Sequence, residues 1–556
     1  MSAAGVAESQ LAARSAARRL EPWVLPALLV LAALLRLPDL ATRGTWDGDQ
    51  GHDMLVLRSF VRDGVVPLLG PPTSIGDVHH GAWYYFLLSP VAALTGGDSP
   101  LAVVAVIAVA GIAAVGIVWW LARSIGGPVG GPLAGAVAGL ALATSAAAID
   151  ESTFIWNPNL IALSSAIALA GAWRAWSGAS PRWWLLAVLG TAVTMQAHVL
   201  GVALFPIVAV PFVLDARRRS MGRVPLGILA IFVAAYMPLA INELTTGFSE
   251  VRAALDYLAS DRTSAAASIP VRFGIVGLRV VSWPLVGLIT AGFVPAVVAT
   301  VTVIGIVAGL WRRGVSGVGG GAGGVGSLVA RSAVRWYGLG LLWSVAFLTI
   351  AAPSLASVIP GLPNDHYHAF ADPMVVVLVG IGAAVIGGVS RVGSGVAVVG
   401  LLALVGWNLT HLPPAVHPDG GYPAAQVAGD RVMAALERAD VTVEDVVLLR
   451  SLPSFKSSEA VAYPLIRAGQ SLVAETPTGI SPGSVADAGG AVGEFRALVL
   501  LCDDLFVESI GAACGGPAED GATDEDGETA DEQWGPFLDR FEAHPGRWVT
   551  VYGPRP

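Results

Sequence analysis

The segment Trp23–Leu35 reads WVLPALLVLAALL, and apolar runs like it recur through the chain from Pro22 to about Thr410. A helix needs about 20 mostly apolar residues to cross a bilayer. Of the 556 residues, 54% are hydrophobic and 13% are charged, whereas soluble domains average about 25% charged residues. The sequence therefore predicts a polytopic, all-α membrane protein.

Basic residues precede this first run, at Arg14, Arg18 and Arg19, in an order that is also typical of a secretory signal peptide. No small-residue cleavage site follows, because the chain continues into Arg36 and a polar loop. We therefore expect a retained first span.

Apolar runs and Arg-rich connections together predict about 11 spans under the positive-inside rule. The Arg-rich connections are then cytoplasmic, so we expect a cytoplasmic N-terminus and an extracytoplasmic C-terminal domain, in the plasma membrane. The expected span centres are Leu29, Ala110, Ala141, Ala166, Leu189, Ile207, Phe232, Val298, Ser344, Gly380 and Leu402.

The net charge changes sign along the chain, from +4 before Gly420 to −13 from Gly420 onward. We predict a transmembrane domain over residues 1–415 and a small soluble α/β domain over residues 416–556, with an acidic disordered loop near 517–533. An acidic domain does not suit nucleic acid, whose phosphates need a basic surface. The expected elements of the second domain are helices 424–438 and 459–468 and strands 446–449, 497–501 and 548–552.

Both cysteines, Cys502 and Cys514, lie in the second domain. They pair if the compartment is oxidising, or they are small buried core residues. The sequence leaves both readings open.

Titratable side chains gather on the predicted outer face. Of the 19 acidic residues before Gly420, only Glu8, Glu21 and Asp215 fall on the cytoplasmic side. Longer outer loops explain part of this, but histidines beside acids are the residues of acid–base and metal chemistry. The eight histidines on or near that face are His52, His79, His80, His198, His366, His368, His411 and His417.

The first outer loop opens with Asp47, Asp49, His52 and Asp53 within seven residues. A helix that starts here would place Asp49, His52 and Asp53 on one face. Alternatively, Asp47 or Asp49 simply caps a helix over Gln50–Arg62, since Asp is a favoured cap; a cap accounts for one carboxylate but not for three beside a histidine. We therefore expect a functional site in this loop.

Later in the same loop, His79 and His80 precede Trp83, Tyr84 and Tyr85. The three aromatic residues are typical of an interfacial belt on a helix that lies along the membrane. The two histidines can hold phosphate oxygens or a metal ion, or they can simply be solvated.

These motifs resemble those of the GT-C glycosyltransferases of the protein-mannosyltransferase and aminoarabinose-transferase type. That family has one span, then a long outer loop with an early Asp-Glu motif and two juxtamembrane helices. Here the motif is Asp49-Gln50, so Gln50 departs from the usual Glu. The segment His79–Leu88 is similar to the H-G-P-x-Y-Y-x-L-L element of bacterial members, with Ala82 in place of Pro.

Three further segments are similar to parts of bacterial members: Trp156–Asn159, Gln196–His198 and Asp365–His368, the last without the family's Pro. The resemblance covers the membrane portion, about three-quarters of the chain. Each motif alone is common, but their order and spacing together are specific.

The resemblance implies an inverting transfer of a sugar from a polyprenyl-phosphate donor to an envelope glycan, lipid or protein acceptor, outside the cytoplasm. Asp49 would be the catalytic base that deprotonates the acceptor hydroxyl. Asp150 and Glu151, with His79, would bind a divalent cation such as Mg²⁺ or Mn²⁺. The expected substrate-binding residues are Asp47, Gln50, Asp53, Arg58, His79, His80, Tyr84, Tyr85, Asn157, Gln196, His198, His366 and Tyr367.

Other readings of the chain stay open. Arg58 can equally be a surface charge near lipid headgroups, and His198 can hydrogen-bond between helices. The alternative function is a polytopic transporter or lipid-linked-sugar flippase, and a third is a non-catalytic assembly protein. No internal repeat relates the two halves of the chain, and the stretch Gly314–Gly326 lacks phosphate-loop spacing and reads as a cytoplasmic linker.

Overall fold

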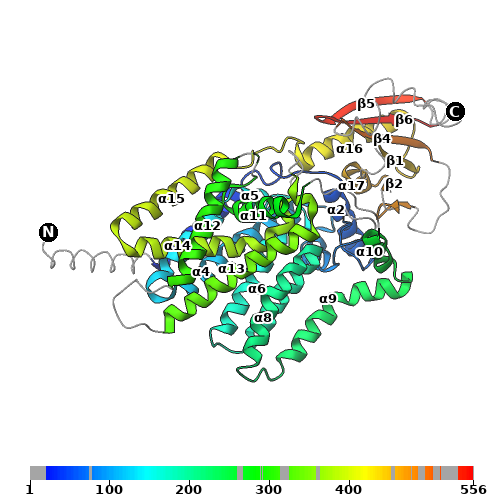
Figure 1. Ribbon diagram of the computed structural model, residues 1–556. Coiled ribbons are helices and arrows are strands. Elements are labelled where there is room, and N and C mark those ends of the chain that lie inside the picture. Colours follow the sequence, from blue (N-terminus) through cyan, green and yellow to red (C-terminus); the bar gives the residue numbers. More distant parts are fainter. Residues whose placement is uncertain are drawn as a thin grey trace.

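The computed structural model describes residues 21–73, 78–259, 267–288, 290, 292–313, 325–357, 364–452, 458–476, 479–485, 495–504, 514 and 536–554. The predicted acidic loop lies outside the described residues, and the predicted glycine-rich linker lies almost entirely outside them. The described chain forms a bundle of helices with a small sheet at one end (Figure 1).

The bundle consists mainly of long apolar helices. Among the described residues, eight helices are long and apolar enough to cross a membrane, and a helix contains each expected span centre. The chain is therefore a multi-pass membrane protein, as the sequence predicts. The bundle helices are residues 21–36, α4 (Pro100–Thr144), α5 (Ala146–Asp150), η1 (Asn157–Leu160), α6 (Ile161–Trp176), α7 (Trp183–Ala197), η2 (Val199–Ala203), α8 (Leu204–Ala216), α9 (Val224–Thr246), α10 (Ser249–Ala259), α11 (Ile269–Val286), α12 (Phe293–Arg313), α13 (Val325–Ala351), η3 (Pro353–Ala356), η4 (Asp365–Ala371), α14 (Asp372–Val389) and α15 (Arg391–Thr410).

The helix labelled α4 is two arms that fold back on each other at Gly127, whose φ is 69°. Only glycine adopts this backbone region readily. On the second arm, Gly131 and Gly135 lie against Arg123 and Trp119 of the first arm. Small residues at these positions let two helices approach closely without a large apolar side chain between them.

Large apolar side chains point away from the bundle. On α9, Leu226 and Val233 are 67% and 57% exposed, and on α15 Leu402 is 66% exposed. In a membrane protein such side chains face the lipid hydrocarbon. A helix can be exposed there because its backbone polar groups are hydrogen-bonded within the helix. The surface of the bundle thus agrees with a membrane location.

None of the expected span centres lies in α11, so this helix is a correction to the predicted topology. Arg279 interrupts the apolar run there, yet the structure buries this side chain to 1% exposure. Its guanidinium bonds both carboxylate oxygens of Asp365, at 2.8 and 2.5 Å. A charge inside an apolar helix is tolerated when it is paired in this way. An Arg within an apolar run therefore predicts a buried acidic partner.

The first loop, between the helix at residues 21–36 and α4, carries α2 (Gly48–Arg62) and α3 (Trp83–Thr95). Asp47 is the N-cap of α2, and with Gln50 it completes a capping box. In this motif the cap accepts from the backbone N–H three residues on, and the residue at that position bonds back to the cap. The predicted helix in this loop is therefore present, with Asp47 rather than Asp49 as its cap.

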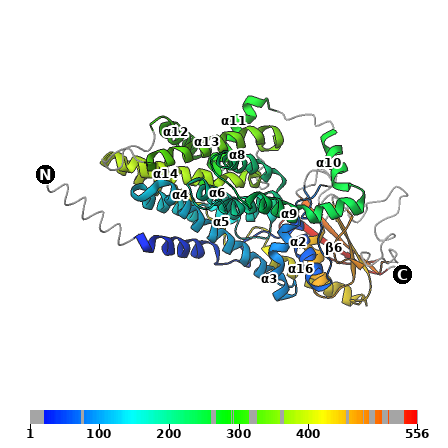
Figure 2. The same ribbon diagram turned by 90° about the horizontal axis from the view of Figure 1, so that it is seen from below.

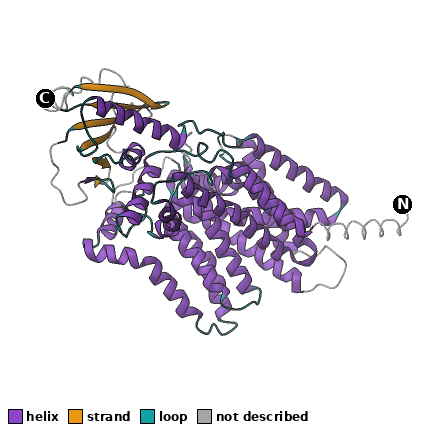
Figure 3. Cartoon of the chain, turned by 180° about the vertical axis from the view of Figure 1, so that it is seen from behind, coloured by secondary structure: helices purple, strands orange, loops and turns teal. Residues whose placement is uncertain are grey.

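In its described residues, the C-terminal domain contains a six-stranded sheet in the order β3-β2-β1-β4-β6-β5, with the strands gathered at one end of the molecule (Figure 3). Strand β1 pairs in parallel with β2 and β4, while β6 is antiparallel to both β4 and β5. All expected elements are present, whereas β2, β3 and β5 were not predicted. The elements are α16 (Gly421–Arg438), β1 (Val447–Leu452), α17 (Glu459–Arg467), β2 (Leu472–Thr476), β3 (Gly479–Ile480), β4 (Ala497–Asp503), β5 (Phe537–His544) and β6 (Arg547–Tyr552).

Two sequence predictions concern the layout of this domain. The predicted boundary at residue 415 lies between the end of α15 and the start of α16. Cys502 at the end of β4 is bonded to Cys514, with an S–S distance of 2.00 Å. Of the two readings, the structure contains the disulfide between Cys502 and Cys514.

The C-terminal domain packs directly on the first loop, at the end of the molecule that carries α2 and α3 (Figure 2). Helix α17 contacts α2, and the two domains share one apolar core that includes Met54, Leu57, Val461 and Tyr463. At Gly51 an added Cβ would collide with the carbonyl oxygen of Glu459. Glycine at this position is what permits so close an approach of the two helices.

Gly51→Ala is expected to destabilise the protein by about 1–3 kcal/mol, because the backbone of α17 cannot move aside as a flexible side chain can. Gly274→Ala is the matched control: Gly274 is also helical, and nothing lies within 4 Å of its added Cβ. That control should be neutral or up to about 1 kcal/mol more stable. Thermal unfolding of the purified variants in detergent measures both, and equal effects would contradict the packing argument.

Candidate functional site

The cap and the first two turns of α2 hold four of the predicted site residues: Asp47, Asp49, Gln50 and Asp53. Asp47 is its cap, and the side chain of Gln50 accepts from the Asp47 backbone N–H and donates to the carbonyl of Ile155, at 2.8 and 2.9 Å. Both ends of the Gln50 amide are thus used inside the protein. A glutamate could not donate to Ile155, which gives a physical reason for Gln50 in place of the usual Glu.

Asp49 and Asp53 differ in their surroundings. Asp49 is exposed to solvent, whereas Asp53 is 1% exposed and accepts from the hydroxyls of Tyr84 and Tyr85 at 2.7 and 2.8 Å. Burial raises the pKa of Asp53 to about 7, although His52 and the two tyrosines lower it. The predicted interfacial belt is therefore wrong for Tyr84 and Tyr85, which are buried because their hydroxyls satisfy a carboxyl group.

His52 joins this turn to the C-terminal domain. Its Nδ1 lies 2.8 Å from Oε1 of Glu459, a buried residue that also accepts from Ser481 at 2.6 Å. Burial alone would lower the pKa of His52, but Glu459, Asp53 and Asp49 raise it to about 9. His52 is therefore an imidazolium at neutral pH, placed among three carboxyl groups.

The His52–Glu459 pair predicts how stability depends on pH. The folded pKa of about 9 lies above the ordinary value of 6.5, so the stabilisation is complete below about pH 6.5 and is lost as the pH rises to about 9. It amounts to at most about 3 kcal/mol. Unfolding midpoints measured from pH 6 to pH 9.5 should fall for the wild type and stay nearly flat in that window for Glu459→Gln; parallel curves would contradict the assignment.

Three histidines from distant segments meet in a second part of the site. The ring centroids of His80 and His198 are 4.8 Å apart, and those of His198 and His366 are 5.2 Å apart. Trp156 lies 4.2 Å from His366, and Tyr367 lies 5.0 Å from His198. We call these five residues the histidine cluster; it joins the first loop, the segment before η1, the α7–η2 break and η4.

The backbone around the histidine cluster is held by its neighbours. The backbone N–H of Gly81 donates to the carbonyl of Gln196 at 2.9 Å, and the Asn157 amide donates to the carbonyl of Ala197 at 2.5 Å. His198 ends α7 in an extended conformation, and its Nδ1 accepts from the backbone N–H of Leu200. Asn157 and Gln196, two of the predicted site residues, thus hold the backbone segments that carry His198 and His80.

Two nitrogens of the cluster remain available. The Nδ1 atoms of His80 and His366 are buried and have no hydrogen-bond partner among the described residues. A buried polar atom without a partner costs free energy, so these two nitrogens are candidates to bind a polar ligand.

A buried ion-pair network supports η4 next to the cluster. Asp365 is paired with Arg279 and lies 2.9 Å from Nε2 of His368, and all three side chains are nearly fully buried. Arg279 also donates to the carbonyls of Leu355 and Ser357, at 2.9 Å each. Sequence reasoning missed Arg279, although an Arg within an apolar run is itself a signal of function or pairing.

His79 is not part of the histidine cluster. Its Nδ1 and backbone N–H bond the two carboxylate oxygens of Glu250 on α10, at 2.9 and 2.7 Å. Burial would raise the pKa of Glu250, but these bonds lower it below its ordinary value. Glu243 in turn accepts from the backbone N–H groups of Glu250 and Val251 and so caps α10.

The predicted metal ligands are not brought together. Glu151 accepts from the indole of Trp283 at 3.0 Å, and Asp150 interacts electrostatically with His417 and Arg43. Across the described ranges, no three His, Cys, Asp or Glu side chains are arranged to hold a metal ion. The grouping of Asp150, Glu151 and His79 around Mg²⁺ or Mn²⁺ therefore does not fit the structure.

Arg58 also lies away from the cluster. It pairs with Asp98 at 3.1 Å, and Arg62 pairs with the same carboxylate. Both arginines line a cavity between α2 and the C-terminal domain, where Ile466 lies opposite. The structure therefore gives Arg58 a role at the junction of the two domains.

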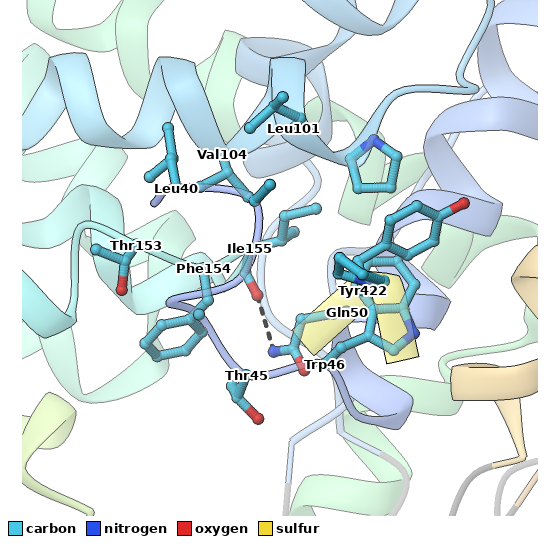
Figure 4. Close-up of a pocket in the computed structure, with 14 residues that line it drawn as sticks. Leu40, Thr45, Trp46, Gln50, Leu101, Val104, Thr153, Phe154, Ile155 and Tyr422 are labelled. Carbon is cyan, nitrogen blue, oxygen red and sulfur yellow. Dashed lines mark hydrogen bonds between the residues drawn. The ribbon is translucent and has the colours of Figure 1, made fainter. Parts of the chain in front are cut away.

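A mostly apolar cavity lies beside Gln50, on the side of α2 that faces the start of α4 (Figure 4). Trp46 and Tyr422 line it from the first loop and the C-terminal domain, and Leu101 and Val104 line it from α4. The bond from Gln50 to Ile155 crosses this region (Figure 4). It links the turn that carries Asp49 to the segment that carries Trp156.

Comparison with known proteins identifies the fold. No protein-family model matches the sequence, and no curated protein sequence matches it. Among solved structures, ArnT from Cupriavidus metallidurans bound to undecaprenyl phosphate aligns over 96% of this chain and 99% of that chain, with a TM-score of 0.55 and 13% identity. AglB from Archaeoglobus fulgidus, in complex with an inhibitory peptide and a dolichol-phosphate, aligns over 88% of this chain and 70% of that chain, with a TM-score of 0.45 and 14% identity. The GT-C fold that the sequence predicts is confirmed.

Proposed function

We propose that this chain is an inverting glycosyltransferase that moves a sugar from a polyprenyl phosphate to an acceptor hydroxyl on the side of the membrane where the C-terminal domain lies. The GT-C fold supports this proposal, because ArnT shares the fold and was solved with undecaprenyl phosphate bound. The observation that carries it is the histidine cluster, in which the Nδ1 atoms of His80 and His366 are buried without a partner in the described part of the chain.

The proposed reaction is a single displacement. Asp49 accepts the proton of the acceptor hydroxyl, and the hydroxyl oxygen forms a bond to the anomeric carbon. The bond from that carbon to the phosphate oxygen breaks at the same time, and the polyprenyl phosphate leaves with the electron pair. Attack from the side opposite the leaving group inverts the anomeric configuration.

The developing negative charge on the leaving phosphate needs fixed donors. The imidazole N–H groups of His80 and His366 are suitable donors, because the His80 ring packs on His198 and the His366 ring packs on His198, Trp156 and Tyr367. Pre-positioned donors of this kind need no rearrangement as the bond breaks.

Asp49 suits the role of base better than Asp53 does. Asp49 is exposed, so an acceptor can reach it, whereas Asp53 is buried and bonded to two tyrosines. The first turn of a helix also stabilises a negative charge through the helix dipole. We assign Asp53, Tyr84 and Tyr85 to holding α2 on α3 rather than to substrate.

The membrane orientation belongs to the same proposal. Arg174 lies in the last turn of α6, and the connections that follow α6 and α8 include Arg182, Arg217 and Arg223. Under the positive-inside rule these connections are cytoplasmic, so the plasma membrane would hold the C-terminal domain and Asp49 on its outer side. The acceptor would then be an envelope glycan, lipid or protein.

The test uses membranes that contain the wild-type protein or Asp49→Asn, incubated with a panel of polyprenyl phosphates that carry different labelled sugars. We expect one donor to lose its sugar, with polyprenyl phosphate formed in equal amount, in wild-type membranes alone. If the wild type consumes none of the donors, or if the lipid only changes leaflet with its sugar attached, the proposed function is wrong.

A further inference from the structure

The turn that carries Asp49 is held on both sides by the C-terminal domain. Before Asp49, the side chain of Thr45 and the backbone N–H of Trp46 donate to Asp419, at 2.6 and 3.0 Å. The indole of Trp46 donates to the carbonyl of Ala460 at 2.9 Å. These contacts join the first loop to the start of α16 and to α17.

The cap of the helix is held by a residue of the sheet. Arg547, at the start of β6, lies 2.8 Å from Oδ1 of Asp47 and 3.0 Å from Oδ2 of Asp503. Its side chain is 9% exposed, whereas that of Asp47 is 36% exposed, so water reaches the pair only from the Asp47 side. Arg547 therefore fixes the residue two positions before Asp49.

On the other side of Asp49, Glu459 holds His52. This carboxylate is nearly fully buried and also accepts from Ser481, so its position is fixed by α17 and by the segment after β3. The backbone of Glu459 touches Gly51 as well. Within residues 45–52, the exposed side chain of Asp49 thus lies between two points that the C-terminal domain anchors.

We propose that Glu459 and Arg547 are positioning residues of the active site, which orient the first turn of α2 and keep the Asp49 carboxylate aimed at the acceptor. The proposal rests on the proposed function, in which Asp49 is the base. It makes the C-terminal domain a part of the catalytic machinery, although neither residue needs to touch substrate.

The charges support this assignment. His52 faces Glu459 from α17 and Asp49 and Asp53 from its own helix, and the pKa of His52 is raised to about 9 although burial lowers it. An imidazolium three residues after Asp49 on the same helix attracts the Asp49 carboxylate. Glu459 therefore acts on Asp49 through the position and the charge of His52.

The first experiment compares steady-state kinetics of the full-length wild type, Glu459→Gln and Arg547→Gln with the donor found in the panel. We expect kcat to fall by about 10- to 100-fold in each variant, because a small misplacement of a catalytic group costs this much. KM for the donor should change less than about 3-fold, since the donor site is not altered. Arg547→Lys keeps the charge and should recover part of kcat.

Glu475→Gln and Arg431→Gln are the matched controls. Glu475 is paired with Arg450, and Arg431 is paired with Asp539, all within the C-terminal domain. These changes remove the same charges from the same domain without touching α2. Both controls should keep the wild-type kcat.

Two further readouts separate positioning from loss of fold. The alkaline limb of the pH profile of kcat should move to lower pH in Glu459→Gln, because His52 then loses its proton at a lower pH. In a His52→Asn background, Glu459→Gln should not lower kcat further. Amide hydrogen exchange over residues 47–52 should be faster in Glu459→Gln than in Glu475→Gln.

Unchanged exchange over residues 47–52 in Glu459→Gln and Arg547→Gln would overturn the positioning role, whether or not any donor is consumed. A kcat and a pH profile equal to those of the wild type would overturn it as well. If the wild type itself consumes no donor, the proposed function fails, and the exchange experiment still decides whether the C-terminal domain orders this turn.

Discussion

Asp49→Asn is expected to lower kcat by about 10²- to 10⁴-fold, because the acceptor hydroxyl then loses the group that accepts its proton. The side chain is exposed at the first turn of α2, so the substitution leaves the buried contacts of that helix intact. KM for the donor should stay close to the wild-type value, since the proposed binding site of the donor phosphate is the histidine cluster and not Asp49. Steady-state rates and a separate measurement of donor binding test both parts.

Asp63→Asn is the control for this change. Asp63 ends the same helix and is exposed, and its substitution removes the same charge. It should keep the full rate. An Asp49→Asn variant that retains more than about a tenth of wild-type kcat would exclude Asp49 as the base, because general base catalysis contributes at least about 10²-fold.

Arg279→Met is expected to destabilise the protein by about 3–5 kcal/mol, because it leaves the buried carboxylate of Asp365 without its partner. Arg279 and Asp365 are both 1% exposed, and two backbone carbonyls also lose their donor. Thermal unfolding in detergent should show the largest loss among the variants described, together with loss of donor binding, since Asp365 precedes His366.

Arg272→Met, on the same helix but only partly buried, should cost much less. The double variant Arg279→Met/Asp365→Leu should be more stable than Arg279→Met alone, because it removes the unpaired charge. If the single and double variants unfold at the same temperature, the pairing does not account for the stability of this region.

The fold was predictable because hydrophobic runs and Arg-rich connections follow directly from the membrane environment. Each expected span centre falls in a helix, and the motifs that resemble GT-C members converge in space. The break at His198 could be expected in a sequence where a polar residue interrupts an apolar run. α11 was missed because Arg279 interrupts its apolar run. The structure pairs this charge with Asp365, which lies far away in the sequence.

The candidate site was only partly predictable. Residue type and order indicated His80, His198 and His366, but the roles of Gln50, Tyr84 and Tyr85 depend on partners that are distant in the sequence. Glu459 follows His52 by 407 positions, and no local pattern links them. Long-range pairs of this kind depend on how the two domains pack. The local pattern of apolar and polar residues in the sequence does not reveal that packing.

The proposed transfer requires that the bond between a sugar and a polyprenyl phosphate breaks. The most direct test reconstitutes the purified wild type and Asp49→Asn in liposomes with a donor labelled in both the sugar and the phosphate, in the presence of an acceptor extract. We expect the two labels to separate with the wild type and to stay together with Asp49→Asn. Labels that stay together in one lipid with the wild type, or that separate equally fast with Asp49→Asn, would contradict it.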